Sequence, residues 1–255
     1  MDIENRVSTA SLPLLHNPEI KLAHNKHKAL KVYFQQLRKL NKEPTDKADV
    51  IASEQKLQSM GYVDYVENLT TQQQQILANN NVINYIPWSA VWKPNSLSTP
   101  CRIVFDASKP TDSGFSLNDI LAKGTNNMNR LVEILIRWSL HTTAFHTDIR
   151  KMYNSVRLQE HHWCLQWYIW ENQLDRKKIR KKKVIKSRIY GVKSSGNQSE
   201  RALRETGRLS STDYPEVANI IMKYKMTVYQ ERNPRNLQPK EQMSWRLLSI
   251  VVAFH

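Results

Sequence analysis

Asp148 and Tyr153 are the residues whose types and spacing most directly suggest chemistry. Asp148 ends a short apolar run at 143–147, and the ring of Tyr153 follows five positions later in the stretch TAFHTDIRKMYNSV. A carboxylate at the end of a strand can face solvent or a metal ion without full desolvation. Capping of a helix is the alternative, because an aspartate at such a place more often caps a helix than binds a ligand.

The chain is strongly basic, with a formal net charge of +15 at pH 7 over 255 residues. This charge favours a polyanionic partner, most simply nucleic acid, although some basic chains are merely soluble. Seven of the eight residues at 176–183 are basic. Such a run is expected to stay out of the core as a solvated loop, and a phosphate-binding or nuclear-import site is the alternative. Its candidate nucleic-acid-binding residues are Arg176, Lys177, Lys178, Arg180, Lys181, Lys182 and Lys183.

Cysteine content and hydropathy restrict the setting of the protein. Cys101 and Cys164 lack the spacing of a disulfide scaffold or a zinc site, so an intracellular, reducing environment is expected, with the compartment undefined. The most apolar stretch, 245–255, is shorter than the roughly 20 residues that a membrane-spanning helix needs. No membrane partner is therefore expected, and the oligomeric state stays open.

The pattern of apolar residues predicts an α+β fold. Helices are expected over residues 27–40, 45–60, 126–140, 194–211 and 214–225. Strands are expected over residues 85–94 and 101–108, which form a hairpin, and over 143–147, 163–170 and 184–192. Residues 70–84 are rich in amides, and a loop or a helix end is expected there.

Four sequence blocks together resemble the reverse transcriptase of BEL/Pao-type LTR retrotransposons. They are VWKPNSLSTPCRIVFDAS, SLNDILAKG, FHTDIRKMYNSVRL and IYGVKSSGNQSERALRETGRLSSTDYPEVANII. The resemblance runs from about Met60 to Lys223 and implies a partial right-hand polymerase, with fingers, a palm and an antiparallel palm sheet backed by helices. The expected parts are a helical lead-in at 1–60, fingers and palm at 61–223, and a non-homologous tail at 224–255.

The resemblance also implies roles for single residues. Asp148 resembles the catalytic palm aspartate that holds Mg²⁺ between a dNTP and the primer end. Two-metal phosphoryl transfer needs carboxylates that converge on the same pair of ions. Arg102 resembles the arginine that clamps the triphosphate, and Lys93 is a looser match for that role because arginine suits phosphate geometry better.

Three further residues resemble parts of the nucleotide-binding surface. Tyr153 resembles the aromatic residue beneath the sugar, with a place in the core as the alternative. Tyr190 and Gly191 match the block under the templating base pair, where glycine allows close approach of the backbone. The implied partners are an RNA template, an RNA–DNA duplex and a dNTP.

One element of the family pattern is missing. The family has a Tyr-x-Asp-Asp turn about ten residues after Pro215, and no two adjacent aspartates occur in the 255 residues. Glu231 lies several positions away from the expected place and is a poor substitute. One carboxylate cannot hold two divalent ions against their mutual repulsion. The sequence therefore predicts a truncated RNA-directed DNA polymerase domain that is inactive alone; the alternatives are a non-catalytic nucleic-acid-binding remnant and a structural protein.

Overall fold

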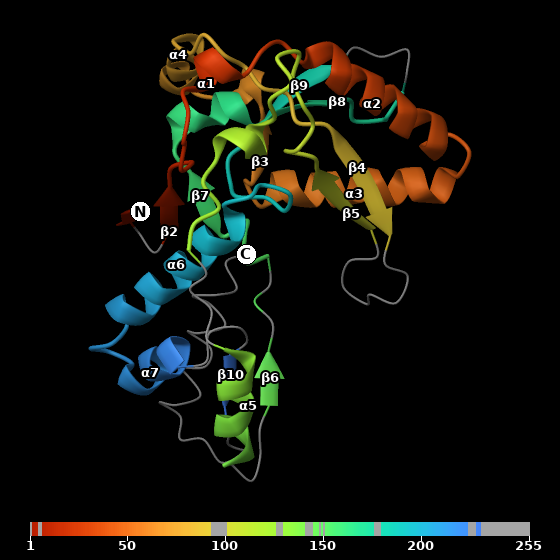
Figure 1. The fold of residues 1–255 in the computed structure, drawn as a ribbon. Helices are drawn as coiled ribbons and strands as arrows, with labels where there is room; N and C mark the ends of the chain where they lie inside the picture. The colour runs from red at the N-terminus through yellow and green to blue at the C-terminus, as the bar shows by residue number, and fades with distance from the viewer. Residues whose placement is uncertain are drawn as a thin grey trace. The chain divides into compact units, whose positions relative to one another are not determined.

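The chain forms two compact units (Figure 1). Unit 1 contains residues 1–8, 124–156 and 196–255, and unit 2 contains residues 9–123 and 157–195. The computed structural model describes residues 2–4, 7–92, 101–125, 130–140, 145–147, 149, 151–175, 180–223 and 228–230. Within these residues the fold is α+β, with helices and small antiparallel sheets, as the sequence predicts.

The bounds of the elements follow the chain order. The helices are α1 (Pro18–Lys21), α2 (Lys26–Leu40), α3 (Pro44–Ser59), α4 (Thr71–Ala78), α5 (Leu131–Ser139), α6 (Ser195–Leu209) and α7 (Pro215–Lys223), with short 3₁₀ helices η1 (Val66–Asn68), η2 (Leu117–Ile120) and η3 (Glu160–Leu165). The strands are β1 (Asp2–Glu4), β2 (Val7–Ala10), β3 (Val63–Tyr65), β4 (Trp88–Trp92), β5 (Cys101–Phe105), β6 (Phe145–Thr147), β7 (Val156–Leu158), β8 (Trp167–Trp170), β9 (Lys181–Ile185) and β10 (Val228–Gln230).

Two antiparallel sheets form the framework of unit 2. The hairpin β4–β5 is confirmed, and its register pairs Trp88 with Phe105 and Val91 with Arg102. The second sheet has the order β3-β9-β8, so β9 is its central strand.

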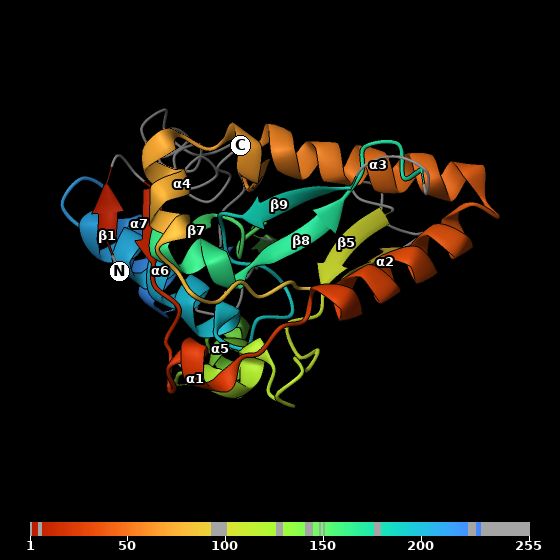
Figure 2. The same cartoon turned by 90° about the horizontal axis from the view of Figure 1, so that it is seen from above.

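An aromatic core lies between these sheets and the helices α2 and α3, which run alongside the strands (Figure 2). Tyr33 of α2 meets Trp88 edge to face at a centroid distance of 6.1 Å, and Trp88 lies 5.1 Å from Trp170. Phe105 meets Tyr168 at 5.2 Å. Such offset aromatic pairs stabilise a core beyond the area they bury. The segment expected as a separate lead-in thus supplies core residues of unit 2.

Helix α4 lies where the sequence predicted a loop or a helix end. Thr70 accepts a hydrogen bond from the backbone N–H of Gln73 at 3.3 Å, and the Gln73 side chain accepts one from the N–H of Thr70 at 3.2 Å. This capping box satisfies two N–H groups that a helix start otherwise leaves unpaired. Leu77 is buried on the inner face. The cap and one apolar anchor thus suffice for a two-turn helix in an amide-rich stretch.

Two expected strands begin at other residues. Of the strand expected over 163–170, only β8 is extended, because residues 160–165 form η3. The strand expected over 184–192 is β9, which begins at Lys181 inside the basic run and ends at Ile185. Cys101 and Cys164 are free thiols, and both are buried in unit 2.

Unit 1 contains the helices α5, α7 and nearly all of α6, each within its expected region. A Cβ on Gly207 of α6 would lie 3.0 Å from Cγ2 of Ile221 of α7, so the two helices pack closely there. β10 pairs antiparallel with β6, with Val228 opposite Thr147 and Gln230 opposite Phe145. Within the described part of the chain, none of the helices has both the length and the apolar character needed to cross a bilayer.

Candidate nucleic-acid-binding site

Asn118 joins three sequence blocks that resemble reverse transcriptase. Its side-chain amide donates hydrogen bonds to Oγ of Ser108 and to the carbonyl oxygen of Gly191, each at 2.8 Å. Its side-chain oxygen accepts a hydrogen bond from the N–H of Lys193, also at 2.8 Å. The blocks VWKPNSLSTPCRIVFDAS, SLNDILAKG and IYGVKSSG therefore meet at one polar residue within unit 2.

The short helix η2 positions Asn118. Ser116 caps this helix, since its hydroxyl accepts a hydrogen bond from the N–H of Asp119 at 3.3 Å. The Asp119 carboxylate in turn accepts two hydrogen bonds from Ser116, one from its hydroxyl at 2.7 Å and one from its backbone N–H at 2.8 Å. These bonds lower the pKa of Asp119 below its ordinary value. The N–H of Asn118 also donates to the carbonyl oxygen of Ala107 at 3.1 Å, so both its backbone and its side chain are fixed.

Gly191 lies against the backbone at the end of β5. Its φ is +98°, and a Cβ at this position would lie 2.2 Å from the carbonyl oxygen of Phe105. No side chain fits at that distance, so this residue must be glycine for the two segments to touch. The approach of Gly191 to a templating base pair stays a prediction from the resemblance; the neighbour that the structure shows is the Phe105 backbone.

The expected substrate-binding residues of unit 2 are exposed. Arg102 lies on β5, and Tyr190 keeps 52% of its surface accessible next to Gly191. Lys193 is exposed beside Asn118. Two cations and an aromatic ring, from Arg102, Lys193 and Tyr190, are thus exposed on the surface of unit 2. Lys93 lies outside the described residues.

Tyr153, the other expected aromatic residue, belongs to unit 1. It is half-buried, and its hydroxyl lies 3.8 Å from the place that a Cβ on Gly196 would occupy. Asp148, the expected catalytic and metal-binding carboxylate, lies outside the described residues. The role of Asp148 therefore remains a prediction from the sequence.

Lys183 contradicts the expectation that the whole basic run stays out of the core. Its side chain is fully buried, and its ammonium donates hydrogen bonds to Oε1 of Glu54 at 2.6 Å and to Oε1 of Gln58 at 2.7 Å. The same Glu54 oxygen accepts from the Tyr168 hydroxyl at 2.7 Å. The ammonium also lies 4.0 Å from the centroid of the Tyr65 ring. Lys183 is therefore a structural residue and not a phosphate ligand.

The buried environment shifts the acid–base properties of this cluster. Burial lowers the pKa of Lys183, and the attraction of Glu54 opposes that shift. Burial and the neighbouring Glu54 carboxylate raise the pKa of Tyr168 well above its ordinary value. The tyrosine therefore stays a neutral hydrogen-bond donor, and a buried charge pair with several hydrogen bonds is the arrangement that a protein interior tolerates.

The neighbouring residues of the run are exposed and ordered by contacts of their own. The guanidinium of Arg180 lies 5.0 Å from the centroid of Phe34 on α2. Lys181 forms an ion pair with Glu67, and the ammonium of Lys182 lies 5.7 Å from the centroid of Trp167. These three cations can still meet phosphates, because all three are exposed. Arg176, Lys177 and Lys178 lie outside the described residues.

The tail strand β10 pairs with the strand that precedes Asp148. Val228 lies opposite Thr147, which is next to Asp148 in sequence, while Gln230 lies opposite Phe145 at the far end of β6. Glu231, which follows Gln230 in sequence, lies outside the described residues, as Asp148 does.

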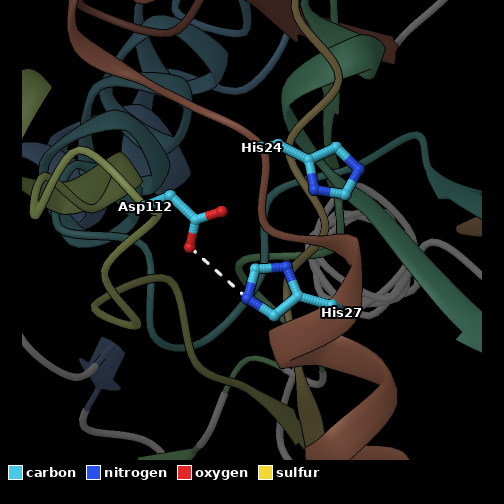
Figure 3. Close-up of side chains that lie close together, drawn as sticks. All are labelled: His24, His27 and Asp112. Carbon is cyan, nitrogen blue, oxygen red and sulfur yellow. Dashed lines mark ion pairs between the residues drawn. The ribbon is translucent and has the colours of Figure 1, made fainter.

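One cluster in the described part of the chain has the residue types of a metal site. Among the residues that the structure describes, one group of three potential metal ligands lies close together, formed by His24, His27 and Asp112 (Figure 3). Magnesium prefers oxygen ligands, whereas this group offers two imidazoles. None of the three is a residue that the resemblance assigns to magnesium. Magnesium at Asp148 stays a prediction from the sequence, because Asp148 lies outside the described residues.

Comparison of the chain with protein-family models and with curated proteins gives no match. The structural roles of Asn118 and of the buried pair Glu54 and Lys183 were not identified from the sequence. The sequence carries a local signal for Asn118, because Ser116 and Asp119 form the S/T-x-x-acid pattern of a capped helix start. It carries none for the buried pair, whose members lie 129 positions apart.

Proposed function

We propose that this chain is a reverse-transcriptase-like fingers and palm region, related to BEL/Pao retroelements, that binds RNA or an RNA–DNA duplex without polymerising by itself. The observation that supports it is the convergence at Asn118 of three separate blocks of the resemblance. These contacts place parts of the three blocks side by side in unit 2, as blocks that form one binding surface must be. Exposed Arg102 and Tyr190 also support the proposal, because they lie close in sequence to Ser108 and Gly191, which Asn118 contacts.

Charge and aromatic exposure fit such a partner. A net charge of +15 attracts phosphates over distances comparable to the Debye length, and an exposed tyrosine can stack on a base. Polymerisation is not part of the proposal, because no adjacent pair of aspartates follows Asp148 in these residues.

The first prediction concerns Arg102. Binding of a fluorescent RNA–DNA duplex, followed by anisotropy, should weaken with salt at a log–log slope of about −0.9 for each phosphate contact. Arg102→Ala should weaken binding and make the slope shallower by about one contact, because one charge on the exposed face of β5 is removed. Arg38→Ala, which removes another exposed arginine, from α2, is the matched control and should leave the slope unchanged.

Two outcomes would contradict the proposal. Binding that does not respond to salt would exclude phosphate recognition and would favour a structural protein. Primer extension with magnesium on an RNA template should give no incorporation above that of Asp148→Ala. A clear excess for the unaltered chain would show that the missing aspartates are supplied in another way, and the non-polymerising part of the proposal would be wrong.

A further inference from the structure

His24, His27 and Asp112 form a cluster that the proposed function does not use. His24 lies just before α2, His27 lies in the first turn of α2, and Asp112 lies in the loop between β5 and η2. One ligand atom from each residue lies within 4.8 Å of the others, and all three side chains are exposed (Figure 3). All three belong to unit 2.

The distances approach those of a metal centre. Nε2 of His27 lies 3.4 Å from Oδ1 of Asp112. In a tetrahedral zinc site with bonds of about 2.0–2.2 Å, neighbouring ligand atoms lie roughly 3.3–3.5 Å apart. The rings of His24 and His27 are nearly parallel, with an interplanar angle of 9°. Rotation of the exposed His24 side chain can bring its ring nitrogen closer to the ligand atoms of His27 and Asp112, which lie within 4.8 Å of it.

The backbone on the histidine side is held in place. Asn25, between the two histidines, is 3% exposed. Its side-chain amide donates to Oδ1 of Asn84 at 2.8 Å and to the carbonyl oxygen of Tyr85 at 3.0 Å. Its side-chain oxygen accepts from the N–H of Tyr85 at 2.9 Å. A residue anchored this way fixes the chain positions from which both imidazoles project.

The loop that carries Asp112 is fastened to the same segment. The N–H of Asp112 donates to the carbonyl oxygen of His24 at 3.3 Å, and the Ser113 hydroxyl donates to that of Lys21 at 2.5 Å. Thr111, which is buried, accepts from the N–H of Ala23 at 3.2 Å. The three candidate ligands are therefore brought together by hydrogen bonds that do not involve their side chains, which is the preorganisation that a metal site needs.

Lys28 is the group that competes for the carboxylate. Its ammonium lies 3.1 Å from Oδ1 of Asp112. It also donates to the carbonyl oxygens of Thr111 at 2.7 Å and Pro110 at 3.2 Å. Because these two carbonyls remain as acceptors, Lys28 keeps partners when a cation takes the carboxylate, although its charge opposes a cation nearby.

We propose that His24, His27 and Asp112 bind one zinc-class divalent cation, with water completing its coordination. Imidazole and carboxylate ligands suit zinc, whereas magnesium and calcium prefer oxygen ligands. The bound cation would link the start of α2 to the loop at 110–115 and so stabilise unit 2. This proposal is independent of nucleic-acid binding.

The test is zinc titration of the untagged full chain, by calorimetry and by the change in Tm. Zinc should bind with one-to-one stoichiometry and raise Tm, and magnesium at the same concentration should do neither. His27→Asn should weaken zinc binding by at least about tenfold. His16→Asn, which removes an exposed histidine outside the cluster, is the matched control and should keep the affinity.

A second variant should strengthen zinc binding instead of weakening it. Lys28→Met removes the competing charge and should tighten zinc binding by about thirtyfold at low salt, the factor expected for one positive charge about 4 Å from a divalent cation in water. Absence of any zinc-dependent heat and Tm shift would overturn the proposal. Equal zinc affinity in His27→Asn and the unaltered chain would overturn it as well, because the cation would then lie elsewhere.

Discussion

Two separate features of the structure require a glycine at position 191. Its φ of +98° is unfavourable for other residues, and the carbonyl oxygen of Phe105 occupies the space next to its Cα. Gly114 has a similar φ of +86°, but a Cβ there would meet nothing within 4 Å. Comparing Gly191 with Gly114 therefore separates the cost of a positive φ from the cost of a steric overlap between a Cβ and the neighbouring backbone.

Gly191→Ala should therefore lower the free energy of unfolding much more than Gly114→Ala. We expect a loss of at least about 3 kcal/mol at Gly191 and of about 1 kcal/mol at Gly114, since only the first adds an overlap to the strain of a positive φ. Chemical denaturation of both variants measures the difference. Equal losses at the two positions would show that Gly191 does not pack against Phe105 as described.

Single residues differ in how far the sequence predicts them. The resemblance predicts a close approach of the Gly191 backbone to a templating base pair. The contact with the carbonyl oxygen of Phe105 was not predictable, because Phe105 lies far away in sequence and β9 ends at Ile185, before Gly191. The burial of Lys183 was not predictable either, because a run of seven basic residues indicates a solvated segment unless the partner is known. That partner, Glu54, lies on a helix far away in sequence.

At the scale of elements, β9 and α3 are joined by a buried charge pair. Lys183→Met should lower the free energy of unfolding by about 3–5 kcal/mol, because it leaves the carboxylate of Glu54 buried without its cation. Lys181→Met, on the same strand, removes an exposed ion pair with Glu67 of η1 and should lose less than about 1 kcal/mol. Equilibrium denaturation compares the two variants.

The double variant Lys183→Met, Glu54→Gln provides the control for uncompensated charge. A glutamine at position 54 can still accept the hydrogen bond from the Tyr168 hydroxyl, so the double variant should be more stable than Lys183→Met alone. If the double variant were less stable than the single one, the loss in Lys183→Met would come from packing instead of charge.

How well each helix or strand could be predicted depends on how strong its local sequence pattern is. α2 follows from clear apolar periodicity, and the hairpin β4–β5 follows from aromatic and β-branched residues on both sides of a stretch rich in Pro, Ser, Thr and Asn. α4 was missed because its amides give no periodicity, although Thr70 and Gln73 form a capping box that is readable in the sequence. β9 was shifted because strand pairing with β3 and β8 extends it into the basic run.

At the scale of the whole molecule, unit 2 is assembled from two separate parts of the chain, 9–123 and 157–195. His162 contributes to that assembly, since its Nδ1 accepts a hydrogen bond from the N–H of Leu12 at 3.1 Å. Burial, with the nearby His161 and Arg188, lowers the pKa of His162 from 6.5 to about 4. The folded chain therefore holds this imidazole neutral where the unfolded chain takes up a proton.

Acidification should therefore destabilise the protein through His162. Between pH 6.5 and 4 the unfolded state binds more protons at this residue, so stability falls as pH falls, by at most about 3 kcal/mol. His162→Asn keeps an acceptor for the Leu12 N–H and should flatten the dependence of Tm on pH in this range. An unchanged pH profile in the variant would assign the acid sensitivity to other groups.

The two cysteines give the native state a chemical signature. Burial raises the pKa of both Cys101 and Cys164 to about 11, and both side chains are closed off from solvent. Alkylating reagents attack the thiolate and need physical access to sulfur. In native buffer, modification of either sulfur must therefore wait for unit 2 to open, so the speed of alkylation measures how often that opening occurs.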